Sequence, residues 1–391
     1  MGLTQHRNSV AIIQEIANLL LLGGHIGRPG AGVCPVRGHS NVQGDRTVGI
    51  NHNPSAKFLS DLHDSTGIAI PTKPGVDSVR AVKSMRGGTA KVFLSMGGNF
   101  VSAMSDTNAT ASALSNCSIT AQISTKPNRS HLVTGRTALI LPCLGRSEKD
   151  HTSVGEQFVS VENSMGIVHS SRGSSKPASG MLRSEPSIVS GIAGALDTRI
   201  GRSGIAWQDL AEDYDKVRDM IEASIPGFEG YNERVRLDGG FYLPNPPRDS
   251  RTFPTESGYA NFRVHDLSGA SAGTGRYLMM TIRSHDQYNT TIYGLDDRYR
   301  GINKGRRVVL MNQSDMDDND WSEGDLVDLT SHFEGTELHA REWYIVPYEI
   351  PKGNIATYFP EANVLVPLDS VAEGSNTPTS KSVVVTIRAT D

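Results

Sequence analysis

Arg37 lies in the first of four polar segments whose residue types could do chemistry. An arginine in a loop next to glycine can present its planar guanidinium group to a small oxyanion in a bidentate contact. His39 follows two residues later and could move protons, because the pKa of an imidazole lies near neutrality. The alternative is a structural loop with a surface arginine. We treat Arg37 and His39 as candidate catalytic residues.

Gly97, Gly98 and Asn99 form the second segment and directly follow the apolar run 91–95. Phosphates and nucleotides bind at the carboxyl ends of parallel strands, where glycine lets a ligand approach the backbone. The asparagine could then read a base or a sugar. A plain turn is the alternative.

The third and fourth segments lie in the last third of the chain. Hydrogen-bonding side chains follow the apolar run 277–281 almost without interruption: Arg283, Ser284, His285, Gln287, Asn289 and Thr290. Such density at the end of a core strand favours ligand binding over a polar turn. Near the C-terminus, Asn363 precedes a hydroxyl-rich stretch that contains Asn376 and Lys381. Small hydroxyls with a lysine suit an anionic or heteroaromatic ligand, and an Asn-Thr-Pro turn is the alternative.

The elements that must position these residues change character along the chain. Apolar residues at helical spacing predict a helix over 7–23. From about 56 to 222, strands and helices alternate, which indicates a parallel sheet with helices on its faces. The runs that define this part are strands at 91–95, 120–123 and 138–142, a helix at 107–115, and an amphipathic helix at 207–224.

A different pattern follows residue 243. The prolines of 243–254 predict an extended segment without helix, and 268–275 is a linker rich in small residues. Short β-type runs separated by turns then predict a β-barrel. These runs are 277–281, 307–311, 326–330, 338–346 and 383–387.

Composition limits the function classes. The formal net charge of −4 predicts no general attraction to nucleic acid or to an anionic membrane, and no apolar run is long enough to span a bilayer. Residues 1–10 lack a secretory pattern, so a cytoplasmic protein is expected. Cys34, Cys117 and Cys143 are too widely spaced to build a disulfide framework or a metal cluster alone, and we expect free thiols that are buried or partly buried.

Taken together, the motifs resemble those of the molybdopterin guanine dinucleotide oxidoreductases. The most similar group is the formate dehydrogenase alpha-subunit-like branch that contains YdeP-type oxidoreductases, and the resemblance runs from Gly2 to Ile387. It rests on motifs in the family's order: Met-Gly-Leu-Thr-Gln-His at 1–6, Gly-Arg-Pro-Gly-Ala-Gly at 27–32, Pro-Val-Arg-Gly-His-Ser-Asn-Val-Gln-Gly-Asp at 35–45, Lys-Val-Phe-Leu-Ser-Met-Gly-Gly-Asn-Phe at 91–100, Leu-Pro-Cys-Leu-Gly-Arg at 141–146, the segment 281–293, and Ser-Asn-Thr-Pro-Thr-Ser-Lys-Ser-Val at 375–383.

The resemblance implies an α/β fold with domains wrapped around two pterin dinucleotides. Residues 1–45 would be the tail of a third α/β domain with a loop on the substrate side. Residues 46–255 would be an incomplete, parallel-sheet (Rossmann-like) molybdopterin oxidoreductase domain. After a linker at 256–275, residues 276–391 would be the dinucleotide-binding β-barrel, of the double-psi, aspartate-decarboxylase-like type.

The resemblance also implies roles for the polar segments. The cofactor would be Mo-bis(molybdopterin guanine dinucleotide), with Arg37 beside the metal to position a small anionic substrate. The glycine loop at 97–99 would cradle one dinucleotide. The barrel segment at 283–290 would hydrogen-bond the pterin, and three further residues would close over the same ligand: Asn363, Asn376 and Lys381. No metal ligand is expected from this chain.

Two departures from the family pattern affect the functional interpretation. Family members are about twice as long, and their N-terminal part supplies a [4Fe-4S] cluster and the metal ligand where one exists. The missing N-terminal half or an electron-transfer partner is therefore expected, and Met1 is interpreted as an internal methionine of a truncated or split gene. The second departure concerns the substrate: this chain has His39 where formate dehydrogenases typically have glutamine, so the resemblance does not imply that the substrate is formate. The chain is thus either one part of a molybdenum oxidoreductase, or a non-catalytic fragment or nucleotide- or pterin-binding module.

Overall fold

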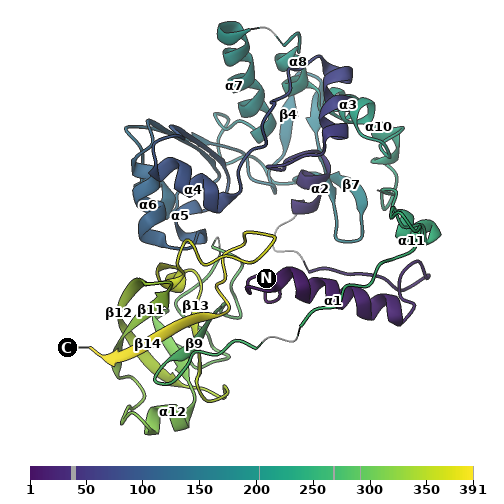
Figure 1. Cartoon of the computed structure of the whole chain (residues 1–391). Coiled ribbons are helices and arrows are strands. Elements are labelled where there is room, and N and C mark those ends of the chain that lie inside the picture. The colour runs from purple at the N-terminus through teal and green to yellow at the C-terminus, as the bar shows by residue number, and fades with distance from the viewer. Residues whose placement is uncertain (37–40, 202, 267–268, 291, 391) are drawn as a thin grey trace.

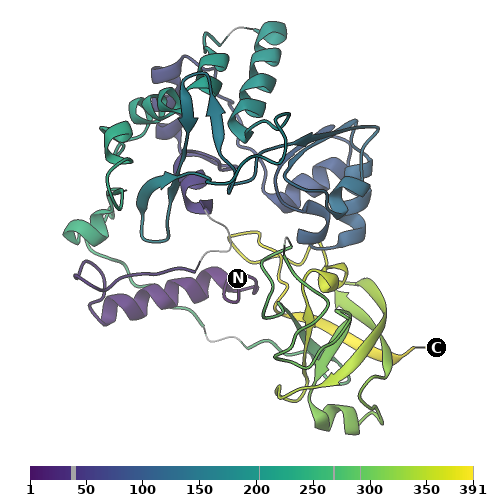
Figure 2. The same ribbon diagram turned by 180° about the vertical axis from the view of Figure 1, so that it is seen from behind.

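The computed structural model describes residues 1–36, 41–201, 203–266, 269–290 and 292–390. It has a mixed α/β architecture, with a parallel sheet in the first half of the chain and a closed barrel at the C-terminal end. Figure 1 shows the barrel below the helices that flank the parallel sheet, and Figure 2 shows the same arrangement from behind. The long first helix, α1 (Ser9–Leu22), starts beside the barrel and runs toward the side of the molecule where α11 (Pro246–Ser250) lies (Figure 1).

Capping residues mark the ends of the helices that precede the sheet. The α1 helix confirms the prediction for 7–23 and ends at Gly23. In α3 (Ala56–Thr66), the Ser55 hydroxyl accepts a hydrogen bond from the backbone N–H of Phe58, and a left-handed Gly67 ends the helix. The remaining two helices here are α2 (Val42–Thr47) and α4 (Ser78–Arg86).

A three-stranded parallel sheet confirms the predicted strand–helix alternation. Its strands, in spatial order, are β1 (Val92–Met96), β2 (Ile119–Ser124) and β3 (Thr137–Pro142). Two helices, α5 (Phe100–Ala103) and α6 (Thr107–Ser115), connect β1 to β2, and the short η1 (Arg129–Leu132) follows β2. The observed α6 has the bounds predicted for that helix. Apolar residues of α4 and α6 form the core beneath one face of the sheet.

Between the parallel sheet and the barrel, small antiparallel sheets alternate with helices. The strands β6, β7 and β8 form one sheet, although β8 comes some seventy residues after β7. The elements of this part are β4 (Asp150–Thr152), β5 (Gly155–Gln157), β6 (Val159–Glu162), β7 (Ile167–Ser171), α7 (Glu185–Ile200), α8 (Trp207–Glu212), α9 (Tyr214–Ser224), α10 (Tyr231–Arg234), β8 (Phe241–Tyr242) and α11 (Pro246–Ser250).

Two predictions for this part were wrong. The single helix expected over 207–224 is interrupted at Asp213, whose backbone is extended and whose side chain caps α9 by accepting from the N–H of Asp215. The segment 243–254, expected to be free of helix, contains the five-residue α11. Proline is tolerated in the first turn of a helix, and Asn245 caps this one by accepting from the N–H of Arg248.

A closed six-stranded barrel confirms the prediction for the last part of the chain. Its order is β10-β12-β11-β14-β9-β13, with parallel pairs β10–β12 and β9–β13 and antiparallel pairs elsewhere. The β13 strand was missed, because its run is short and mixed in polarity. The elements are β9 (Tyr277–Ile282), β10 (Val308–Met311), α12 (Gln313–Asp317), β11 (Leu326–Phe333), β12 (Thr336–Pro347), β13 (Asn354–Tyr358), η2 (Glu361–Leu365) and β14 (Val383–Ala389).

The three cysteines are free thiols in different surroundings. Cys117 and Cys143 are buried as expected, and burial raises the pKa of Cys143 to about 11. Cys34 is exposed, so the expectation of burial was wrong there, and its apolar neighbours Val33 and Val36 are exposed as well. Over the described ranges, none of the helices combines the length and the apolar character that crossing a bilayer requires.

The β11 strand offers a direct test of the barrel core. Leu329 is fully buried among the core residues of the barrel, whereas Leu326 on the same strand is 50% exposed. Leu329→Ala should lower the free energy of unfolding by about 3 kcal/mol, because it removes buried methyl groups and leaves a cavity. Leu326→Ala is the matched control and should cost less than about 1 kcal/mol. Urea unfolding measures both, and equal losses would contradict this assignment of the core.

Candidate functional site

The loop after β1 is open to a ligand on its outer side. Gly97 and Gly98 both have positive φ, of 67° and 76°, a conformation that favours glycine. A Cβ atom added at either position would meet no atom within 4 Å. The loop is held from within, because the Asn128 side chain donates to the carbonyl of Gly98 (2.8 Å). Backbone is therefore presented at the carboxyl end of a parallel strand, where phosphate-containing ligands bind.

Asn99 is largely buried and already engaged with the protein. Its side-chain oxygen accepts a hydrogen bond from the Ser130 hydroxyl (3.0 Å), and that hydroxyl in turn accepts from the N–H of Val101 (3.0 Å). The structure thus places Asn99 beneath the glycine loop as part of its support. Its expected contact with a nucleotide stays a prediction.

Arg306, which the sequence analysis did not single out, organises the barrel segment after β9. Its buried guanidinium donates to the Ser284 hydroxyl (3.0 Å) and to the Gln287 side-chain oxygen (2.9 Å). It also donates to the Phe359 carbonyl (2.8 Å) and forms an ion pair with Glu361 (2.9 Å). Ser284 and Gln287 therefore hold the segment in place from below. A lone arginine before a strand gives no sequence signal for such a role.

Asp297 orients His285 in the same segment. The buried Asp297 carboxylate accepts hydrogen bonds from Tyr358 (2.8 Å), Arg300 (2.7 Å) and Nδ1 of His285 (3.0 Å). Burial acts to raise the pKa of Asp297, but the hydrogen bonds from Tyr358, Arg300 and His285 outweigh it and lower the pKa to about 2. In the tautomer that carries its proton on Nδ1, the ring donates this hydrogen bond and Nε2 is left as an acceptor. The His285 side chain is 42% exposed.

Arg283 and Lys381 bring two positive charges together without a matching negative charge. Within the described part of the chain, neither forms an ion pair with a carboxylate, and the Nε of Arg283 is buried without a hydrogen-bond partner. Burial, reinforced by the charge of Arg283, lowers the pKa of Lys381 to about 8. Burial also lowers the pKa of Arg283. A bound anion would relieve this destabilisation of both side chains.

Lys381 is also fixed by its neighbours on two sides. Its ammonium donates to the backbone carbonyl of Thr281, at the end of β9. Its own N–H donates to the carbonyl of Gln5 (3.1 Å), and the Ser380 hydroxyl donates to the Gln5 side chain (2.9 Å). His6 bonds the Ser382 hydroxyl through Nδ1 (2.7 Å). The motif at 1–6 and the motif at 375–383 therefore form one structural unit beside Arg283.

Asn363 and Asn376 join the barrel to the helices of the parallel sheet. The Asn363 amide donates to the carbonyl of Ser102 in α5 (2.8 Å), and the Asn376 amide donates to the Asp77 carboxylate that caps α4 (2.9 Å). Both amide groups thus act between parts of the protein, and their closing over a ligand stays a prediction. The contact of Asn363 brings the segment after β13 against the helix that follows the glycine loop, as the proximity of α5 to the barrel in Figure 1 illustrates.

The remaining barrel residues lie around this segment. Thr290 is buried, and Asn289 has a positive φ of 48° while its carbonyl accepts from the Gln287 amide (2.8 Å). The structure therefore brings the third and fourth polar segments together at one end of the barrel. The glycine loop reaches them through α5 and η2.

Arg37 and His39 lie outside the described residues. The residues on either side of them, Pro35 and Gln43, both line a cavity of 610 Å³. The buried Glu162 lines the same cavity and accepts from Gln43 (2.8 Å) and from the Thr47 hydroxyl (2.5 Å). These bonds anchor α2 to β6, so the chain that leaves the Arg37 segment enters a fixed helix.

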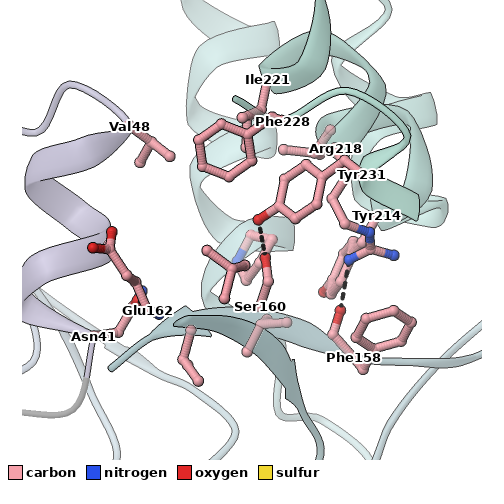
Figure 3. Close-up of a pocket in the computed structure, with 16 residues that line it drawn as sticks. Asn41, Val48, Phe158, Ser160, Glu162, Tyr214, Arg218, Ile221, Phe228 and Tyr231 are labelled. Atoms are coloured by element: carbon pink, nitrogen blue, oxygen red, sulfur yellow. Dashed lines mark hydrogen bonds between the residues drawn. The ribbon is translucent and has the colours of Figure 1, made fainter. Parts of the chain in front are cut away.

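Glu162 also lines a smaller cavity of 180 Å³, which Figure 3 shows. Its walls are mostly apolar, and its polar side chains form hydrogen bonds within the protein. Ser160 hydrogen-bonds the Tyr231 hydroxyl (2.6 Å), and Arg218 donates to the Phe158 carbonyl (3.2 Å) while stacking over the ring of Phe158. The charged side chains in its lining, Arg218 and Glu162, are therefore already hydrogen-bonded within the protein.

Comparison with known proteins shows similarity to a cofactor-binding domain family and to two bacterial proteins. Residues 277–384 match the Molydopterin dinucleotide binding domain family. The chain is 52% identical over 396 residues to an uncharacterized oxidoreductase of Mycobacterium tuberculosis, a match that covers 100% of this chain and 50% of the relative. It is 44% identical over 393 residues to protein YdeP of Escherichia coli, which covers 98% of this chain and 51% of YdeP.

A more distant match points to the formate dehydrogenase group. YrhE of Bacillus subtilis, named only provisionally as a formate dehydrogenase, is 33% identical over 117 residues, or 28% of this chain and 12% of YrhE. These matches confirm the resemblance on which the sequence analysis relied. The chain spans about half the length of the curated relatives that it matches most fully.

The lowered pKa of Lys381 predicts a pH-dependent stability. Between its folded value of about 8 and its ordinary value of 10.5, the unfolded chain holds more protons, so stability should rise with pH. Below pH 8, Lys381 is charged in both the folded and the unfolded chain, so the free energy of folding includes the full cost of burying its charge. Lys381→Met should remove this rise, whereas the exposed-lysine control Lys57→Met should keep it. Urea unfolding across this range measures the effect, and an unchanged rise in Lys381→Met would contradict the assignment.

Proposed function

We propose that this chain belongs to the molybdopterin oxidoreductase family and forms the C-terminal part of a molybdenum enzyme. The enzyme would resemble formate dehydrogenases and take electrons from a small anionic substrate. One observation carries the proposal: within the matched dinucleotide-binding domain, Arg283 and Lys381 lie together, and no residue that the structure describes supplies a counter-charge. A dinucleotide supplies that charge through its phosphates.

The residues present fit such a cofactor. The Nε of Arg283 is buried without a partner, and the outer side of Gly97 and Gly98 is open, as a close contact with a bulky anion requires. We assign Arg283 and Lys381 to the phosphate or pterin oxygens of one dinucleotide, and the glycine loop to the backbone contact with a dinucleotide. The proposed cofactor is Mo-bis(molybdopterin guanine dinucleotide), whose metal supplies the redox chemistry when it is bound.

His285 has a defined role in this proposal. Asp297 fixes a proton on Nδ1, so Nε2 of the neutral ring can accept a hydrogen bond from an N–H group of the pterin. Asn289 and Thr290 follow on the same segment and would contribute further polar contacts. Ser284 and Gln287 would act through Arg306, which holds the segment in place.

Arg37 and His39 complete the proposed active site. Arg37 would hold the substrate anion in a bidentate contact, and His39 would take or return the substrate proton. The histidine at position 39 favours a substrate other than formate itself.

The rest of the enzyme would come from the half of the relatives that this chain does not match. We assign a [4Fe-4S] cluster, the other parts of both pterin sites and any protein ligand of the metal to that half. The domain around the parallel sheet would be Rossmann-like, and the barrel, with its two parallel pairs, would be of the double-psi type. The chain alone would be inactive and could act only as a pterin- or nucleotide-binding module.

Retention of pterin tests the assigned contact. Arg283→Gln should lower the pterin that copurifies with the chain at least tenfold, since one charge-assisted contact to phosphate contributes on the order of 1.5–3 kcal/mol. Arg276→Gln is the matched control, because Arg276 is an exposed arginine at the opposite end of β9. Pterin fluorescence after acid release measures occupancy. Equal occupancy in both variants would contradict the assignment.

Arg37 is tested in the assembled enzyme, with this chain and the other half expressed together. Arg37→Gln should lower kcat/KM for the substrate anion by on the order of a hundredfold, because it removes a bidentate contact to the reacting group. The molybdenum content should stay at the wild-type level. Steady-state kinetics and metal analysis measure the two quantities. Wild-type kcat/KM in Arg37→Gln would remove Arg37 from the active site.

A further inference from the structure

Among the described residues, one face of the parallel sheet is exposed along its two outer strands, β1 and β3. Alternate side chains of β1 point to opposite faces, and Phe93 packs with the helices α4 and α6. On the other face, Val92, Leu94 and Met96 are 61%, 50% and 55% exposed. The register places Leu94 beside Ala121 and Ala121 beside Leu139. Leu139 on β3 is 47% exposed, whereas Ala121 and Ile123 on the middle strand are buried between their neighbours on β1 and β3. We call Val92, Leu94, Met96 and Leu139 the open face.

Such exposure is unusual for this kind of sheet. Parallel sheets are covered on both faces, because the crossovers between parallel strands place helices there. Within the described residues, α4, α5 and α6 cover one face, whereas Val92, Leu94 and Met96 of β1 are exposed on the other. The strands β1 and β3 also have one neighbour each, so the two edges of the sheet are open as well. The sheet therefore resembles one part of a larger sheet whose second face would be covered.

The α1 helix supports the same conclusion from another part of the chain. It is strongly apolar, yet its only buried residue is Ser9. Leu19 and Leu22 are 69% and 75% exposed. Contiguous apolar surface of this kind marks sites of protein contact.

We propose that the open face is the docking surface for helices of the polypeptide that corresponds to the unmatched half of the relatives. The match covers about half of each relative, so the other half of each relative is a segment about as long as this chain. Helices are the usual cover of a parallel sheet, and apolar helix faces fit the aliphatic open face. The inference rests on the proposed function in one respect, namely that the chain works as one part of a larger oxidoreductase.

Binding between the two halves tests the proposal. The tagged probe is the half of the Mycobacterium tuberculosis relative that this chain does not match. Leu94→Glu should weaken its binding to the full chain at least tenfold, because the variant places a carboxylate in an apolar interface. Leu326→Glu is the matched control, since Leu326 is also a leucine on a strand and is also 50% exposed. The uncharged variant Leu94→Gln should weaken binding less, and thermal melting confirms that each variant is folded.

Oxidation of native methionines gives a second measurement on the wild-type chain. Met96 lies on the open face, and Met280 lies on the barrel with 36% exposure. In the complex, peroxide should oxidise Met96 at least fivefold more slowly than in the free chain, while Met280 keeps its rate. Both rates are measured by mass spectrometry without added cofactor.

Several results would overturn the docking surface. These are the absence of binding by the wild-type chain, wild-type affinity in Leu94→Glu, or unchanged oxidation of Met96 in the complex. A homodimer that Leu94→Glu disrupts, with binding of the probe unaffected, would assign the open face to a second copy instead. A chain that retains pterin but does not bind the probe overturns the docking surface alone. A chain that binds the probe but retains no pterin overturns the proposed function alone.

Discussion

The buried guanidinium of Arg306 is the interaction on which the ligand-facing end of the barrel depends. It donates to Ser284 and Gln287 after β9 and to the Phe359 carbonyl after β13, and it forms an ion pair with Glu361. A buried charge is tolerated only when its donors are satisfied, so these segments have little freedom to separate. The position of the polar run after β9 therefore follows from one side chain that contacts no proposed ligand.

Arg283 and Lys381 show the opposite arrangement in the same place. Their charges are close and partly buried, and the described structure provides no carboxylate for either. A protein selected only for stability would pair or remove such charges. Their retention next to a fully satisfied Arg306 separates two roles: Arg306 supports the segment, and we propose that the other two cations present positive charge to a ligand. This division agrees with the family match over 277–384.

The two halves of the chain differ in how complete they are. The barrel is closed and has its own core, so its strands leave no free edge. The parallel sheet has three strands, with helices on one face and exposed aliphatic side chains on the other. Contacts from Asn363 and Asn376 tie the incomplete part to the complete one. The barrel can thus position the glycine loop even though the sheet that carries this loop is only partly covered.

Local pattern in the sequence determined the type of each major element. The apolar periodicity of α1, the bounds of α6 and the three parallel strands all follow from residues close together in the chain, as does the existence of a barrel. The motifs likewise identified the polar segments. Where local signals compete, the sequence was insufficient: Asp213 interrupts a helical pattern, and Asn245 starts a helix among prolines. Only the tertiary structure decided which polar residues support the site and which face a ligand, because those roles depend on partners far away in the sequence. Arg306 meets Gln287 and Phe359, Asn363 meets Ser102, and Lys381 meets Thr281, and no local pattern encodes these contacts.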